Sequence, residues 1–183
     1  MSVKQQLVTA EELYEMPEVP GKSRELVDGE VVEVSPVKLR HGLITGLVYD
    51  ALKHHVRQHN LGLVIGDNFG YVLKRDPDTM RVPDVSFLAR DRAPDLDRFG
   101  EGPPTIAVEV ISPTDRASDI QERVRDYLQA GTLQVWILWP RSRSMSVYRP
   151  DADTLELGSE GYLDGGDALP GFSVRVGDLF DVE

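Results

Sequence analysis

The chain has 183 residues, of which 40% are hydrophobic and 28% charged, enough for one globular domain with an apolar core. It contains no cysteine, which excludes a disulfide framework and a thiolate metal site. The formal net charge of −11 argues against broad, nonspecific attraction to nucleic acid but permits a local basic groove. No segment resembles a secretory signal or a membrane span, so we expect a cytoplasmic protein without membrane association.

The N-terminal part of the chain predicts a short helix, a hairpin and a long helix. Thr9 followed three residues later by Glu12 is a capping-box arrangement that starts a helix. Apolar residues alternate on both sides of Asp28-Gly29, a pair that favours a two-residue type I′ turn, which predicts a β-hairpin. Residues 41–59 carry apolar residues at helical spacing.

The rest of the chain reads as strands around a second helix. A helix is expected over 118–130, before Gly131, and a polar loop over 90–104. The C-terminal third is turn-rich and short-stranded, and no linker or repeat interrupts the chain. We therefore expect a single α/β domain over residues 1–183. Strand segments are expected over 61–66, 70–76, 80–90, 105–112, 133–140 and 145–150.

Two of these expected strands carry a carboxylate among apolar residues. Asp84 shares a strand face with Ser86, and Glu109 lies opposite Val108 and Val110. A buried carboxylate costs several kcal/mol unless it is paired, protonated or bound to a cation. Two acids on neighbouring strands would converge where a divalent cation relieves their repulsion. Alternatively, Asp84 is a turn or capping residue at a strand end and Glu109 pairs with an arginine.

Five segments resemble, in order, the Uma-type family of putative restriction endonucleases, within the PD-(D/E)xK superfamily of restriction endonuclease type II-like proteins. The resemblance implies a restriction-endonuclease-like mixed β-sheet flanked by α-helices. It implies a metal-dependent endonuclease that hydrolyses DNA phosphodiester bonds, with Asp84 and Glu109 as ligands for Mg²⁺ or Mn²⁺. It also matches Glu25 and His41 to positions at the site. The segments are 25–41, 83–87, 107–113, 119–131 and 169–180.

The sequence departs from this superfamily at the catalytic lysine. Ile111 occupies the position two residues after the second acid, where that lysine is expected. In the family the lysine lies instead on the following helix, four residues before a tyrosine, and that position here is Arg123. A guanidinium cannot act as a general base, although it can orient water and stabilise developing negative charge. Alternatively, Arg123 is a surface residue paired with Asp119 or Asp126.

Three further assignments have plain structural alternatives. Glu25 is either near the site or a solvated strand residue, and His41 either faces the acids or is a polar residue of the first helical turn. His55 and His59 have the spacing of a helical metal pair, but no third ligand follows, which favours a solvated helix end.

The function that we expect is that of a DNA endonuclease, in which Glu25 or His41 positions the attacking water and Arg123 steadies charge. Two alternatives are a catalytically impaired nuclease-fold module that binds or regulates, and a metal-dependent hydrolase of a small phosphorylated substrate. A homodimer is a reasonable arrangement where two strands must be cut. The expected phosphate contacts are Lys38, Arg40, Lys74 and Arg116.

Overall fold

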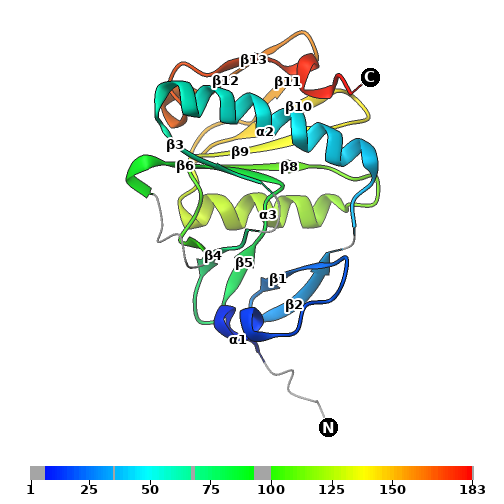
Figure 1. Ribbon diagram of the computed structural model, residues 1–183, viewed down its shortest axis with the longest axis vertical. Coiled ribbons are helices and arrows are strands. Elements are labelled where there is room, and N and C mark those ends of the chain that lie inside the picture. The colour runs from blue at the N-terminus through cyan, green and yellow to red at the C-terminus, as the bar shows by residue number, and fades with distance from the viewer. Residues whose placement is uncertain (1–6, 35, 67–68, 93–99, 183) are drawn as a thin grey trace.

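The fold of the chain is described by a computed structural model over residues 7–34, 36–66, 69–92 and 100–182. Figure 1 shows two long helices, α2 (Leu39–His59) and α3 (Ala117–Ala130), on opposite sides of a band of strands. A second sheet lies beyond α3. The predicted α/β class is confirmed, as mixed sheets flanked by helices.

The larger sheet has six strands in the order β11-β10-β9-β8-β6-β3. Strands β8 and β9 run parallel, joined by α3, and the other neighbours are antiparallel. Side chains alternate along each strand, so the two faces of this sheet pack into two different hydrophobic cores. Val85 and Val108 pack with α2, whereas Ala107 and Ile137 pack with α3. The strands are β3 (Gly62–Ile65), β6 (Val85–Ala89), β8 (Ile106–Val110), β9 (Gln134–Trp139), β10 (Ser144–Tyr148) and β11 (Leu155–Leu157).

The second sheet has five strands in the order β2-β1-β5-β4-β7. The predicted hairpin forms β1 and β2, and its turn residues Asp28 and Gly29 have φ of 48° and 81°. The predicted capping box of Thr9 and Glu12 starts α1 (Ala10–Glu15), which packs on this sheet. The strands are β1 (Ser23–Val27), β2 (Glu30–Val34), β4 (Tyr71–Lys74), β5 (Thr79–Arg81) and β7 (Gly100–Glu101).

The prediction of one strand over 80–90 is wrong. The chain leaves β5 at Arg81, passes Pro83, and enters β6 at Val85 in the other sheet. Proline has no N–H to donate to a strand ladder, so strand pairing ends near Pro83. The apolar pattern of the sequence continues across this point and hides the break. Three residues, 82–84, therefore connect the two sheets. The expected polar loop contains η1 (Arg90–Arg92) and β7, and residues 93–99 lie outside the described residues.

The C-terminal third closes the face of the larger sheet that carries α2. Leu163, Leu169, Phe172 and Val176 join the same core cluster as the apolar side of α2. Within the described ranges, no helix combines the length and hydropathy needed to cross a membrane. The elements of this third are β12 (Tyr162–Asp164), η2 (Gly166–Ala168), β13 (Ser173–Arg175) and η3 (Val176–Phe180).

A pair of glycine substitutions tests this packing. Gly46 lies inside α2, and a Cβ there would meet nothing within 4 Å. Gly46→Ala should raise the free energy of unfolding by about 0.5–1 kcal/mol, because alanine loses less backbone entropy in a helix. At Gly62, where φ is 154°, a Cβ would lie 2.0 Å from the Leu88 carbonyl oxygen, so Gly62→Ala should destabilise. Urea titrations measure both, and a destabilising Gly46→Ala would contradict the prediction.

Candidate active site

The candidate site lies at one end of the larger sheet, where β6 begins and β8 ends. These strands are antiparallel neighbours with Val85 opposite Val108, so the start of one lies beside the end of the other. Asp84 directly precedes β6, and Glu109 is the penultimate residue of β8. Figure 1 shows that α2 and α3 both begin at this same end. The topology thus brings two helix starts and two acids together.

Asp84 is fixed through both of its carboxylate oxygens. One oxygen lies 2.9 Å from Nε2 of His41, in the first turn of α2. The other accepts a hydrogen bond of 2.7 Å from the backbone N–H of Val110, across the strand pair. The side chain of Asp84 is 18% exposed and that of His41 is 12% exposed. Asp84 therefore lies at a strand end, which was the structural alternative to a metal ligand. His41 faces this acid, which was the functional assignment for His41.

Glu109 is 3% exposed and receives both of its side-chain partners from α3. Arg123 donates from Nη1 to one carboxylate oxygen at 3.2 Å, and the Tyr127 hydroxyl donates to the other at 3.0 Å. These partners are four residues apart, so they stand one turn apart on the same face of the helix. Arg123 thus contacts Glu109, not Asp119 or Asp126 as the surface alternative proposed.

Glu25 is 1% exposed, so the interpretation of a solvated strand residue is wrong. Arg81 donates to one of its oxygens at 3.0 Å, and the backbone N–H of Val82 donates to the other at 3.1 Å. This N–H is available because the chain has just left β5. Arg123 Nη2 lies 3.6 Å from the same oxygen that Arg81 contacts. Arg81 in turn binds Asp126 on α3, at 2.6 and 2.9 Å.

These contacts form one largely buried ladder of alternating acidic and basic side chains, Glu109–Arg123–Glu25–Arg81–Asp126, between the two sheets. Sequence reasoning missed two of the groups involved. Arg81 appeared as an ordinary strand residue, although a cation between Met80 and Val82 is itself a signal of a buried ion pair. Tyr127 lies on the helix predicted over 118–130 and was given no role at the site, although the family pattern includes a tyrosine there.

The electrostatics of Glu109 favour its neutral form in the metal-free protein. Burial raises the pKa of its carboxyl to about 8, against the lowering effect of Arg123. The nearby charges of Asp84 and Glu25 raise this pKa further, which shows that the three acids interact. Burial opposes the charge on Arg123, but Glu109 and Glu25 outweigh it and raise the pKa of the guanidinium. Burial, followed by Glu109, also raises the pKa of Tyr127, which keeps its hydroxyl a donor.

The donor chemistry at the site suits a hard divalent ion. Mg²⁺ characteristically takes one or two protein carboxylates and completes its shell with water and substrate oxygens, which matches Asp84 and Glu109. Each carboxylate oxygen has a second lone pair beyond its present bond. Among the described residues, no three acidic or histidine side chains cluster as a ready-made metal site. Arg123 already donates a hydrogen bond to Glu109, so an arriving ion would compete with this guanidinium.

The exposed cations expected at the site differ in availability. Lys38 and Arg116 precede α2 and α3, Arg40 lies in the first turn of α2, and none has a carboxylate partner within the part of the chain that the structure describes. Lys74 binds Asp28 at 2.6 Å and is neutralised. A small cavity of about 50 Å³ borders Glu109 and Arg123 and is lined also by Asp115 and Asp119.

Histidines 55 and 59 do not form a metal pair with a third ligand in the described residues. Nε2 of His55 lies 3.0 Å from the carbonyl oxygen of Pro170, and its ring meets the edge of Phe172. This histidine therefore ties α2 to the C-terminal third.

The pH dependence of stability tests the burial of Glu109. The folded-state pKa of Glu109, about 8, lies above the ordinary value near 4.5. The stability that Glu109 contributes to the folded state is therefore fully present below pH 4.5 and is lost as the pH rises through 8. The melting temperature of Glu109→Gln minus that of the wild type should therefore increase between pH 5 and pH 9 in EDTA. Each kcal/mol corresponds to about 2–4 °C. Glu160→Gln, at a side chain 82% exposed, is the control, and parallel curves for Glu109→Gln and wild type would contradict the prediction.

Comparison with known proteins agrees with this architecture. A solved structure titled as a putative nuclease of DUF820 from Anabaena variabilis ATCC 29413 matches with a TM-score of 0.82 and 18% identity. The match covers 96% of this chain and 98% of that one, and it supports the same fold. No curated protein matches the chain. The Uma2 family model, described as "Putative restriction endonuclease", matches residues 10–177, so the chain belongs to the Uma2 family.

Proposed function

We propose that this chain is a metal-dependent endonuclease that hydrolyses phosphodiester bonds in DNA. The observation that carries the proposal is the convergence of Asp84 and Glu109 at adjoining strand ends, beside the partly buried Arg123. The descriptions of the Uma2 family and of the Anabaena nuclease support the same class of activity. Cytoplasmic location, a homodimer and a single domain over 1–183 stay predictions.

In this proposal Asp84 and Glu109 would hold Mg²⁺ or Mn²⁺. Such an ion, when bound, neutralises charge on the phosphate and makes the attacking water more acidic. The protein's part is to present two carboxylates whose positions are already fixed, one by His41 and Val110, the other by Tyr127 and Arg123.

The remaining side chains take distinct roles. Arg123 stabilises negative charge that develops on the phosphate, since its guanidinium stays protonated and cannot accept a proton. His41 is the better candidate for positioning water, because its imidazole meets Asp84 at the site and can exchange a proton. Glu25 is assigned to holding Arg123 and Arg81, because both of its oxygens already accept hydrogen bonds.

Contact with DNA would fall first on three exposed cations at the starts of the long helices. Lys38, Arg40 and Arg116 are exposed, and the N-termini of both helices add positive potential at this end. The net charge of −11 makes this attraction local, so binding should weaken steeply as salt increases.

A second candidate function is a binding module that keeps the nuclease fold without cleavage. The observation that favours it is the pairing of Arg123 with both Glu109 and Glu25. This pairing satisfies the acids without a metal, and an arginine stands where the family has lysine. The two functions differ in whether metal both binds and supports hydrolysis.

Metal binding should stabilise the fold through both acids. Mg²⁺ or Mn²⁺ at 100 times its dissociation constant should add about 2.7 kcal/mol to the free energy of unfolding. Because burial holds Glu109 protonated near neutral pH, binding at pH 7 should also release up to one proton. Thermal melts against EDTA and calorimetry in buffers of different ionisation enthalpy measure the two effects. The same melting shift in Asp84→Asn/Glu109→Gln would place the metal elsewhere.

Substitutions at Arg123 separate the two functions. Arg123→Lys should raise metal-dependent nicking of supercoiled plasmid, because a flexible ammonium can approach the attacking water and lose its proton when desolvated. Arg123→Ala should lower nicking. It should also lower the melting temperature in EDTA and enlarge the metal-induced rise, because Glu25 and Glu109 would lose a partner whose place the metal could partly take.

Arg125→Ala is the matched control, since Arg125 is on the same helix with a side chain 58% exposed. Equal nicking by wild type, Arg123→Lys and Arg123→Ala would show that Arg123 has no part in the chemistry. If metal binds but wild type and Arg123→Lys cut neither DNA nor RNA, the binding module replaces the nuclease.

A further inference from the structure

Helix α2 and its flanking residues differ in charge from the rest of the chain. Residues 38–60 contain four of the 20 Lys and Arg residues and one of the 31 Asp and Glu residues. The segment therefore has a formal charge of +3 on a chain of net charge −11. All four histidines of the sequence also lie on it. A basic helix on an acidic protein indicates attraction to a polyanion at that place.

The cations of α2 also lack carboxylate partners within the described residues, whereas several exposed cations elsewhere have one. Lys22, Lys74, Arg75, Arg143 and Arg175 each bind an acid within 3 Å. Within the described residues, Lys53 and Arg57 have no carboxylate within 4 Å; Lys53 lies over the ring of Tyr49, 4.8 Å from its centroid. These charges remain open to an external anion.

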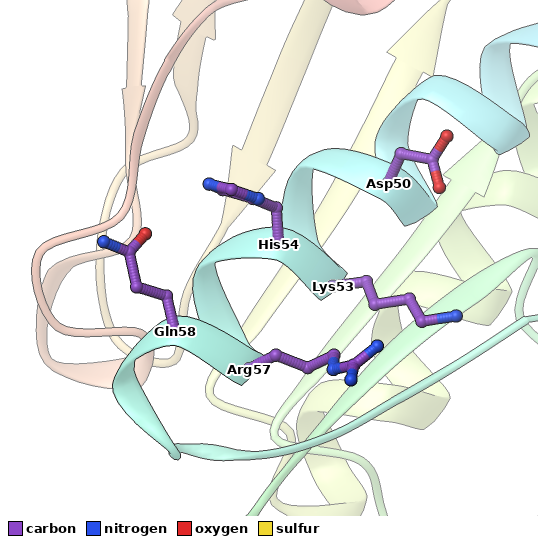
Figure 2. Close-up of a pocket in the computed structure, with 5 residues that line it drawn as sticks. All are labelled: Asp50, Lys53, His54, Arg57 and Gln58. Carbon is purple, nitrogen blue, oxygen red and sulfur yellow. The ribbon is translucent and has the colours of Figure 1, made fainter.

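Lys53 and Arg57 border an open hollow of about 600 Å³ with Asp50, His54 and Gln58. All five lining residues come from α2, so the hollow lies along the helix surface and is open on its outer side. Figure 2 shows Lys53 and Arg57 extending toward the same side of the helix, with Asp50 one turn before them. Four residues of α-helix span about 6 Å, so the two cations can meet separate phosphate groups.

We propose that this outer face of α2, formed by Lys53, His54, Arg57 and Gln58, is a second contact surface for the phosphate backbone of duplex DNA. This proposal rests on the proposed function, because the surface would hold the part of the DNA substrate that flanks the cleavage site. A second pair of cations, Lys38 and Arg40, lies at the catalytic end of the helix, beside His41, which contacts Asp84. From Lys38 to Arg57 the helix rises roughly 28 Å, about eight base pairs of duplex.

The middle of this outer face offers no obstacle to a long ligand. Gly42 and Gly46 leave open space where other residues would carry side chains, and Asp50 is the one acid among residues 38–60. Two pairs of cations, Lys38 with Arg40 at the catalytic end and Lys53 with Arg57 at the other, fit a long polyanion such as duplex DNA better than an isolated acidic patch on a protein.

The test measures binding of a fluorescein-labelled 30-base-pair duplex by anisotropy in EDTA, across a series of NaCl concentrations. Each lost phosphate contact lowers the slope of log K against log salt by about 0.9, so Lys53→Ala/Arg57→Ala should lower its magnitude by about two. Affinity at low salt should fall about tenfold or more. The double variant Lys22→Ala/Arg125→Ala removes the same charge from the smaller sheet and α3, away from α2, and should leave the slope unchanged.

An unchanged slope in Lys53→Ala/Arg57→Ala would overturn the inference, as would an equal change in the control or the absence of duplex binding by wild type. Melting temperatures of both variants should match wild type, since the mutated side chains lie outside the core. The assay contains EDTA and reads binding alone. A wild type that fails to nick plasmid would therefore end the proposed function without altering this result.

Discussion

The buried ladder from Glu109 through Arg123, Glu25 and Arg81 to Asp126 is the interaction on which the rest of the structure depends. It draws on β8, α3 and both strands β1 and β5, so it fixes the smaller sheet against the larger one. Removing one partner leaves a buried charge without compensation, which costs far more than the loss of a surface ion pair. The acids of the candidate site are therefore also structural residues.

This arrangement sets the terms on which a metal ion can bind. In the metal-free protein Arg123 donates to Glu109 and lies beside Glu25. Under the proposed function, an ion would displace part of that pairing and a proton from Glu109, which would cost affinity, but the carboxylates it met would already be oriented. Arg123, freed from Glu109, would then remain next to the phosphate, held by Glu25. The same contact would thus serve a resting state and an active one.

Local signals in the sequence predict the elements, and long-range contacts decide the site. The capping box of Thr9, the Asp28-Gly29 turn and the apolar spacing of both long helices are local, so their boundaries could be predicted. The strand break at Pro83 was missed because the apolar alternation of Arg81 to Leu88 continues across it. Which sheet each half joins depends on distant partners.

The burial of Glu25 shows the same limit. Its own strand alternates like any half-exposed hairpin, and its burial arises from α3 and from Arg81, which is 56 residues away in sequence. The family pattern singled out Arg123, which helical spacing alone would leave at the edge of the apolar side of α3; its contact with Glu109 is observed, and its role stays a prediction.

Strand β2 is the outer edge of the smaller sheet, and its first four residues are exposed, with Val31 and Val32 showing apolar surface. An exposed edge offers free backbone donors and acceptors to any other strand. Glu30 and Glu33 bracket the two valines, and Lys22 binds Glu33. A second β2 that paired in register with this edge would bring like charges into opposition. The acidic composition of the chain thus also works as a guard against aggregation, and that guard weakens wherever these two glutamates become protonated.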